Sequence, residues 1–216
     1  MKWIRHKLRL FINGFIGPEP HPQKWVFIVG CYNSGTTLLY SILSKHPDIG
    51  SLPSEGQFLT DQFPVPKYEG LPRLWALKPE KFHLIEGQGK NINVKRLKKQ
   101  WGAMFNDVSR PILIEKSPTN AARVRWLQEN FNPAYFIGII RNGYAVSEGI
   151  RRKAGHHIRK CAQQWAVSNE IMLNDFQYLK NKIIIKYEEF TNFPEEWTIK
   201  LEEFLGLEHK ISVDGK

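Results

Sequence analysis

The feature that most constrains the fold is a glycine-bounded turn between an apolar run and an amphipathic run. Residues Trp25–Gly30 are apolar and β-rich, Gly30–Thr37 read GCYNSGTT, and Thr36–Lys45 carry leucine and isoleucine at helical spacing. This order predicts a buried parallel strand, a tight turn and a helix. Backbone N–H groups and a helix N-terminus in that arrangement can cradle a phosphate. The sequence therefore predicts a phosphate-binding loop early in the chain.

Three later apolar runs are also strand-like, and a helical pattern follows each of them. The runs are Ile112–Glu115, Tyr135–Ile140 and Ile183–Tyr187, and the helical patterns are Ala121–Glu129, Tyr144–Lys153 and Glu195–Leu205, with Gly206 as the terminating residue. Strands that alternate with helices indicate an α/β domain with a central parallel sheet. Ligands bind beyond the carboxyl ends of such strands. The polar residues after each strand are therefore expected to share one site.

The turn has the GxxxxG spacing of a Walker A loop, but Thr36 stands where that motif has lysine. A nucleoside triphosphatase needs this lysine on the β- and γ-phosphates, together with Mg²⁺. The difference argues against ATP or GTP chemistry and is compatible with a nucleotide that has one 5′-phosphate. An ordinary strand–turn–helix connection with small polar residues also remains open.

Charge and cysteine content bound the partners and the compartment. The 216 residues include 31 Lys and Arg against 21 Asp and Glu, a net charge of +10. This excess suggests a polyanion, such as a nucleic acid, a membrane surface or a phosphorylated cofactor. Cys31 and Cys161 form no disulfide framework and no recognised metal spacing. A reducing, cytoplasmic location is therefore expected.

The first 24 residues form a basic amphipathic segment that precedes a single α/β domain at 25–216. Residues 1–17 mix Lys2, Arg5, Lys7 and Arg9 with large apolar side chains. They lack the uninterrupted apolar core and cleavage site of a signal peptide. Two interpretations remain open, a helix packed on the domain and a basic helix in peripheral contact with a membrane surface.

Four segments that include the predicted loop occur in the order found in one known family. They are VFIVGCYNSGTTLLYSILSKHPDIGSLPSEGQFL at 26–59, ILIEKSPTNAARVRW at 112–126, YFIGIIRNGYAVSEGIRRK at 135–153 and IIIKYEEFTNFPEEWTIKLEEFLGL at 183–207. They resemble the sulfotransferases that use 3′-phosphoadenosine 5′-phosphosulfate (PAPS), nearest the tyrosylprotein and carbohydrate branch. The resemblance implies a P-loop-like three-layer fold with a central parallel sheet flanked by helices. It also implies PAPS as donor, 3′,5′-ADP as product, and no required metal.

By position, the resemblance assigns residues to both ends of PAPS. The 5′-phosphosulfate would be held by Asn33, Ser34, Gly35, Thr36 and Thr37, and the remainder of the nucleotide by Arg141, Ser147, Gly149, Lys153 and Tyr187. Among these, Arg141 and Lys153 would hold the 3′-phosphate and Tyr187 would lie near the adenosine. A guanidinium just beyond a buried strand can contact phosphate through two parallel hydrogen bonds. A structural salt bridge is the alternative role of Arg141.

Two positions depart from the family pattern. Asn33 stands where the family usually has Arg or Lys, and Gly149 stands where it has the serine eight residues beyond its arginine. Ser147, two positions before Gly149, is the weaker substitute. With Asn33 uncharged, Lys116 would carry more of the charge stabilisation. A degenerate member that binds nucleotide without turnover is therefore one alternative.

The chemistry requires a general base near the loop. The resemblance favours Glu55, which follows the predicted helix by a short connection, whereas His46 in His-Pro-Asp is expected to close that helix. The acceptor would be a hydroxyl or amine, on a carbohydrate or a protein tyrosine among others. The segment from Pro64 to Gln100, which contains Trp75, Phe82, His83 and a lysine-rich run, is expected to shape its cleft.

Two functions of other classes remain as alternatives. A P-loop kinase of nucleotides or small molecules predicts binding of ATP with Mg²⁺. A non-catalytic polyanion-binding protein predicts salt-dependent binding without preference for PAPS. The sequence contains no recognised nucleic-acid module, so a nucleic acid is not the expected partner.

Overall fold

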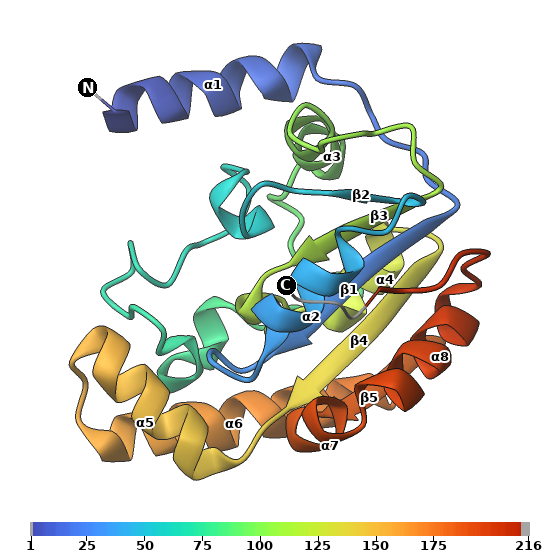
Figure 1. Cartoon of the computed structure of the whole chain (residues 1–216). Coiled ribbons are helices and arrows are strands. Elements are labelled where there is room, and N and C mark those ends of the chain that lie inside the picture. Colours follow the sequence, from blue (N-terminus) through green and yellow to red (C-terminus); the bar gives the residue numbers. More distant parts are fainter. Residues whose placement is uncertain (1, 213–216) are drawn as a thin grey trace.

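The apolar runs form one parallel sheet in the order β2-β3-β1-β4-β5 (Figure 1). The strands are β1 (Lys24–Gly30), β2 (Ile49–Ser51), β3 (Ile112–Lys116), β4 (Ala134–Ile140) and β5 (Asn181–Lys186). In this computed structural model, which describes residues 2–212, β1 lies at the centre and pairs with β3 and β4. The predicted central parallel sheet is confirmed.

Helices cover both faces of the sheet and make three layers. They are α1 (Lys2–Ile16), α2 (Thr36–Leu43), α3 (Val94–Gly102), α4 (Val124–Asn130), α5 (Gly143–Ala154), α6 (Ile158–Phe176), α7 (Tyr187–Asn192) and α8 (Pro194–Leu205), with 3-10 turns η1 (Gly56–Phe58), η2 (Trp75–Leu77), η3 (Pro79–Lys81) and η4 (Pro118–Ala122). Most predicted bounds shift by one or two residues, and in two places the type of element also differs from the prediction. The run from Ala121 begins as a 3-10 turn, and Tyr187 starts α7 instead of ending the strand.

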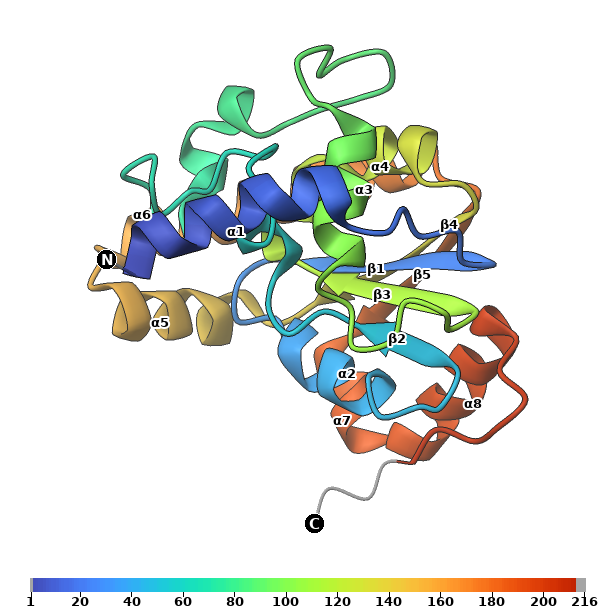
Figure 2. The ribbon, with the colours of Figure 1, turned by 90° about the horizontal axis from the view of Figure 1, so that it is seen from above.

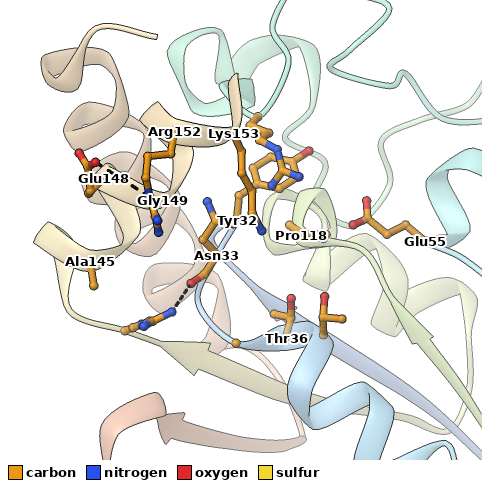
Figure 3. A pocket seen from close by; sticks show the side chains of 14 residues that line it. Tyr32, Asn33, Thr36, Glu55, Pro118, Ala145, Glu148, Gly149, Arg152 and Lys153 are labelled. Carbon is orange, nitrogen blue, oxygen red and sulfur yellow. Dashed lines mark hydrogen bonds and ion pairs between the residues drawn. The ribbon is translucent and has the colours of Figure 1, made fainter. Parts of the chain in front are cut away.

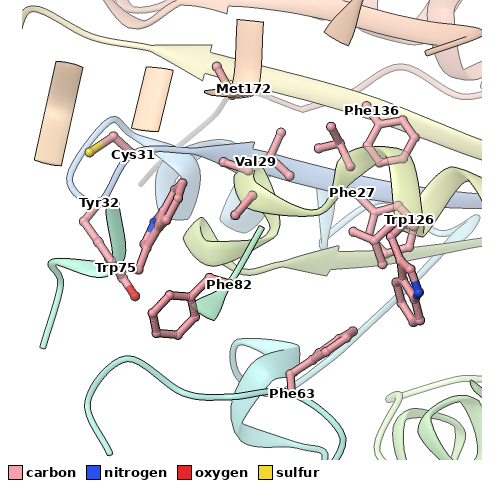
Figure 4. Packing of buried hydrophobic residues seen from close by; sticks show 14 of the residues in the cluster. Phe27, Val29, Cys31, Tyr32, Phe63, Trp75, Phe82, Trp126, Phe136 and Met172 are labelled. Atoms are coloured by element: carbon pink, nitrogen blue, oxygen red, sulfur yellow. The ribbon is translucent and has the colours of Figure 1, made fainter. Parts of the chain in front are cut away.

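Alternate residues of β1 point to opposite faces of the sheet and so belong to two cores. Trp25, Phe27 and Val29 join a largely aromatic cluster with side chains from α3, α4 and α6 (Figure 4). Val26 and Ile28 join an aliphatic cluster with side chains from α2, α7 and α8. Both faces of β1 are thus buried, as the continuous apolar run predicts.

Helix α6 is the element that periodicity did not reveal. Its buried residues follow a helical stripe, at Cys161, Gln164, Ser168, Met172 and Asp175. Most of that stripe is polar, so it produces little hydrophobic signal. The buried polar groups have specific uses: Gln164 Oε1, for example, accepts a hydrogen bond from the backbone N–H of Ala76 at 2.8 Å.

The segment between β2 and α3 contains only short 3-10 turns but is anchored in the core. Trp75 and Phe82 are 0% and 1% exposed. These two side chains pack inside the aromatic cluster and so anchor the segment instead of lining a cleft. That the segment as a whole shapes the acceptor cleft stays a prediction. His83 instead pairs with Asp175, with 2.8 Å between Nε2 and Oδ2.

Helix α1 lies across the outside of the domain, against α3 (Figure 2). The side-chain amide of Gln100 donates to the carbonyl oxygen of Leu10 at 2.9 Å, and Lys99 Nζ donates to that of Phe15 at 2.7 Å. Among residues 2–212, no helix combines the length and the apolar character needed to cross a bilayer.

Candidate active site

A pocket of about 440 Å³ opens where β1 and β4 end (Figure 3). It is lined by Tyr32, Asn33, Gly35, Thr36 and Thr37 from the turn after β1, by Arg141, Ala145, Glu148, Gly149, Arg152 and Lys153 from the end of β4 and α5, and by Glu55, Arg73 and Pro118 from other segments. The carboxyl ends of neighbouring parallel strands thus meet at one cavity, as expected for this class of sheet.

The backbone of the turn is tightly folded and packs on Tyr187. Asn33 and Gly35 have positive φ angles of 65° and 101°. A Cβ atom added to Gly35 would lie 2.2 Å from the ring of Tyr187, so only glycine fits there. Gly35 also precedes α2, whose first turn is not capped by any side chain. The N–H groups of that turn are therefore suited to an anion.

Arg141 is joined to the same turn. Its Nη1 donates to the carbonyl oxygen of Asn33 at 3.1 Å, and its guanidinium stacks 4.1 Å from the ring centre of Tyr187. The backbone carbonyl of Arg141 accepts a hydrogen bond from Trp165 Nε1 at 2.9 Å. Gly35 and Arg141 therefore line one pocket and contact the same aromatic ring.

Helix α5 approaches the turn closely at Gly149. A Cβ atom there would lie 3.2 Å from Asn33 Nδ2. The two departures from the family pattern are thus in contact with each other. Asn33 Nδ2 and Ser34 Oγ are both buried, and neither has a hydrogen-bond partner among the described residues. Buried polar atoms normally have partners, and Asn33 lines the pocket, so its amide fits a polar ligand at the turn.

Positive charge predominates around the pocket. Arg73, Arg141, Arg152 and Lys153 line it, against the carboxylates of Glu55 and Glu148. Glu148 is itself paired with Arg151, the other arginine of α5, with 2.7 Å between its Oε2 and the Nε of Arg151. The pocket therefore suits a ligand with several negative charges. Within residues 2–212, no three His, Cys, Asp or Glu side chains gather as metal ligands would.

Glu55 and Lys116 lie together at the side of the pocket opposite α5. Lys116 Nζ is 3.2 Å from Glu55 Oε1, and the amide of Gln57 donates to Glu55 Oε2 at 2.6 Å. The Gln57 side chain is in turn fixed by Thr119 Oγ1, which donates to its carbonyl oxygen at 2.6 Å. The Glu55 carboxylate is thus held in one orientation with its partners on each oxygen.

The buried carboxyl group of Glu115 lies behind Glu55 and Lys116. Glu115 accepts a hydrogen bond from the N–H of Gly56 at 2.8 Å, and also bonds to Ser117 and Asn120. Burial raises the pKa of Glu115 to about 7, against the hydrogen bonds that lower it. Nearby Arg123 is completely buried, and burial lowers its pKa to about 10. The hydrogen bond from Gly56 to Glu115 thus positions Gly56, the residue that follows Glu55.

Three sequence-predicted residues lie elsewhere. Ser147 does not line the pocket; it lines a neighbouring apolar groove on the other side of α5, next to Trp165. Ser34 lies beneath the turn, fully buried. His46 closes the end of α2, as expected, because its Nδ1 accepts from the N–H of Asp48 at 3.2 Å. The structure brings together the other residues that sequence reasoning selected, either lining the pocket or directly behind it.

Sequence reasoning missed two of the pocket cations. Arg152 belongs to the basic cluster at 151–160, but nothing in that run distinguishes it from the exposed Arg151. Arg73 comes from the irregular segment after η1, where it has a positive φ of 64° and lies over the ring of Tyr32. A non-glycine residue with positive φ is uncommon. No pattern in the sequence predicts that Arg73 lines the pocket.

Comparison with protein families gives a match over most of the chain. A family model described as "Sulfotransferase family" matches residues 26–210. Among curated relatives, protein-tyrosine sulfotransferase A of Caenorhabditis elegans is 26% identical over 85% of this chain, and the protein-tyrosine sulfotransferase of Drosophila melanogaster is 29% identical over 84%. The chain covers only 50% and 38% of the lengths of these two relatives.

Solved structures show the same fold. The sulfotransferase domain from the curacin biosynthetic pathway superposes with a TM-score of 0.60 at 23% identity, covering 88% of this chain and 76% of that one. The sulfotransferase domain from the Synechococcus PCC 7002 olefin synthase gives 0.59 at 22% identity, covering 90% and 78%. The P-loop-like three-layer architecture is confirmed by these neighbours and by the sheet itself.

Proposed function

Because this chain belongs to the sulfotransferase family, we propose that it transfers the sulfuryl group of PAPS to the hydroxyl of a protein tyrosine, with 3′,5′-ADP as the other product. One observation carries the proposal. The glycine turn after β1 and Arg141 after β4 line a single basic pocket and pack on the same ring of Tyr187. A nucleotide with phosphates on both sides of its ribose needs two such anion sites.

The residues present fit this donor. The uncapped first turn of α2, with Thr36 and Thr37, would hold the 5′-phosphosulfate. Asn33 lines the pocket, and its Nδ2, which is buried and has no partner among the described residues, would offer a further donor beside it. Arg141, with Lys153, would hold the 3′-phosphate, and the Tyr187 ring would flank the adenosine. When bound, PAPS supplies the sulfuryl group, and its departure leaves negative charge on a 5′-phosphate oxygen.

The side chains opposite α5 supply the proton chemistry. Glu55 takes the proton of the acceptor hydroxyl as the oxygen–sulfur bond forms. Gln57 and Lys116 hold the Glu55 carboxylate in its orientation. Lys116 also places a positive charge beside the leaving phosphate, in the place of the cation that Asn33 does not provide. No metal-dependent step is required in this scheme.

A tyrosine acceptor is favoured by the relatives in worm and fly, whose names specify protein tyrosine. The pocket agrees with an acceptor that carries negative charge nearby. Arg73 and Arg152 line its mouth in addition to the cations proposed for the donor. A carbohydrate or an amine would be the acceptor if tyrosine peptides proved inert while the donor still bound.

A titration tests the donor, and a transfer assay tests the acceptor. Thermal shifts should be measured with 3′,5′-ADP, AMP and ATP–Mg²⁺ at equal concentrations, because specific binding raises apparent stability. We expect the largest shift with 3′,5′-ADP. Labelled PAPS should then transfer sulfate to tyrosine peptides flanked by acidic residues and not to their phenylalanine analogues. A preference for ATP–Mg²⁺ would contradict the proposal and favour a kinase.

A further inference from the structure

Helix α1 carries an apolar stripe that the domain does not cover. Of the sixteen large hydrophobic residues that are exposed in the described chain, seven belong to this one helix of 15 residues. Ile4, Leu8 and Phe15 are 65%, 56% and 58% exposed. At 100° per residue these three share one face of the helix, together with Phe11 and Ile12. Such a concentration of exposed apolar surface marks an interaction site.

The opposite side of α1 attaches it to the domain. Leu10 is its buried residue, at 5% exposed. The carbonyl oxygens of Leu10 and Phe15 accept hydrogen bonds from Gln100 and Lys99 of α3. Arg96 of α3 lies beside one edge of the stripe, with its guanidinium 5.4 Å and 5.3 Å from the ring centres of Phe11 and Phe15. Figure 2 shows helix α1 on the outside of the molecule. Apart from this edge, the side chains of the stripe remain largely exposed on the described structure.

Cations border the stripe, and no acid lies on the helix. Arg5, Lys7 and Arg9 are exposed, His6 is half-buried, and residues 2–16 contain no Asp or Glu. The helix N-terminal end adds Trp3, which is 58% exposed and lies 4.0 Å below the ammonium of Lys7. An apolar face flanked by cations, with an aromatic residue at one end, is the pattern of helices that lie in the interface of an anionic bilayer.

A groove continues the apolar surface beneath the helix. It has a volume of about 870 Å³ and lies between α1 and residues 57–69, with Phe63, Val65 and Tyr68 on its far wall. The two acids of that wall are already paired, Asp61 with Arg96 and Glu69 with Lys81. The groove therefore adds apolar area to the stripe and little free negative charge to oppose an anionic surface.

We propose that α1 docks the protein on the surface of membranes that contain anionic phospholipids. The apolar stripe enters the interface between head groups and acyl chains, while Arg5, Lys7 and Arg9 contact lipid phosphates. The groove adjoins the pocket, because Gln57, which lines the groove, donates a hydrogen bond to Glu55. The inference is independent of the proposed donor and acceptor.

Vesicle sedimentation with the full chain tests the proposal. We expect binding to vesicles of phosphatidylcholine with 30% phosphatidylserine to be at least about tenfold tighter than binding to phosphatidylcholine alone. Addition of 0.5 M NaCl should reduce that difference, because salt screens surface charges. Equal binding to both vesicles, or no binding to either, would overturn it.

Matched variants separate the helix from the overall charge. Arg5→Glu with Arg9→Glu should weaken binding about tenfold or more. Arg159→Glu with Lys160→Glu changes the net charge by the same amount on an exposed part of α6, and should change binding less than about threefold. Equal losses in the two double variants would show that net charge alone attracts the protein, and would contradict a role of α1.

The apolar stripe needs its own test. Ile4→Gln with Leu8→Gln should weaken binding about tenfold, whereas Ile199→Gln on α8, which is 55% exposed, should not. Ile12→Cys can carry an environment-sensitive dye, since Cys31 and Cys161 are buried, and its emission should shift to the blue with anionic vesicles. If the dye responds instead to protein concentration without lipid, and light scattering shows a dimer, the stripe is a self-interface and the proposal is wrong.

Discussion

The two ends of the pocket, named below for the nucleotide binding and the sulfuryl transfer that we propose for them, are positioned in different ways. The nucleotide end, residues 33–37 with Arg141 and Gly149, is held by backbone conformation and by close contact between the turn, α5 and Tyr187. The transfer end, Glu55 with Gln57 and Lys116, is held by side-chain hydrogen bonds that continue to buried Glu115 through the N–H of Gly56. The geometry of the nucleotide end therefore depends on close packing, whereas the geometry of the transfer end depends on hydrogen bonds between side chains.

This difference separates binding from turnover. Changes of shape at the nucleotide end should reduce affinity for 3′,5′-ADP and, where backbone strain results, the stability of the fold. Changes of hydrogen bonding at the transfer end should reduce the rate of transfer and leave nucleotide affinity almost unaltered. Each variant below tests whether an effect stays at the end where its residue lies.

The largest effect is expected for Glu55→Gln. Removal of the base should slow sulfuryl transfer by about 10²–10⁴-fold, while calorimetry gives nearly the same affinity for 3′,5′-ADP. Glu148→Gln is the control, because that carboxylate also lines the pocket but pairs with Arg151. Full activity of Glu55→Gln would remove Glu55 from the transfer end.

Gly35→Ala should be the next most severe change. Its φ of 101° would strain an alanine, and the added Cβ would collide with Tyr187. Together these should lower the free energy of unfolding by roughly 4 kcal/mol and abolish nucleotide binding. Gly70→Ala has a similar positive φ of 71° but no atom within 4 Å of the new Cβ. If chemical denaturation finds equal losses, the contact with Tyr187 is unimportant.

Stability should depend on pH through Glu115. Its folded-state pKa of about 7 lies above the ordinary 4.5, so the folded chain holds this proton more tightly than the unfolded chain. The stabilising contribution is complete below pH 4.5 and is lost as pH rises to about 7, by about 3 kcal/mol. Urea unfolding at pH 5 and pH 8 should show this fall in the wild type and in Glu170→Gln, an exposed control, but not in Glu115→Gln. Parallel pH curves for all three proteins would refute it.

Arg141→Ala should act on binding. Loss of a charged hydrogen bond to the 3′-phosphate should weaken the binding of 3′,5′-ADP by about 1.5–3 kcal/mol. The binding of AMP, which has no 3′-phosphate, should be nearly unchanged. Arg141→Lys keeps the charge but not the two parallel donors, so it should lie between the wild type and the alanine variant. Calorimetry that gives equal losses for both nucleotides would assign Arg141 a structural role only.

The smallest effect is expected for Gly149→Ala. The new Cβ would lie 3.2 Å from Asn33 Nδ2, so the side chain of Asn33 must shift slightly. A weakening of 3′,5′-ADP binding by about 1 kcal/mol is expected. Asn33→Gly keeps the positive φ but removes the amide side chain. In that background, Gly149→Ala should not change the affinity for 3′,5′-ADP. Additive effects in this double-mutant cycle would show that the two positions are not coupled.

Much of the fold could be predicted because its signals are local. The run Trp25–Gly30 is apolar at every position but the last, and both faces of β1 are indeed buried. Gly206 adopts the positive φ of 63° expected of the residue that ends a helix. The strand, glycine turn and helix of the proposed nucleotide end were also predicted, because these three elements are contiguous in the chain. Helix α6 was missed because Gln164, Ser168 and Asp175 occupy its buried face.

The contacts of the transfer end could not be predicted, because they join residues that are far apart in the sequence. Glu55 and Lys116 were selected by resemblance, but nothing in the sequence indicated their ion pair or the hydrogen bond from Gln57. Arg73 reaches the pocket from an irregular segment whose path is set by Trp75 in the core. These contacts join residues that become neighbours only after the sheet has formed.

By itself, the sequence determined the parallel α/β sheet, the glycine turn after β1 and the excess of positive charge, because each depends on neighbouring residues or on composition. Only the tertiary structure decided that Gly149 lies close beside Asn33, that Ser147 faces away, and that the apolar stripe of α1 stays largely exposed. Helical periodicity shows that a helix has an apolar face, but the direction of that face depends on what the rest of the chain places beside it.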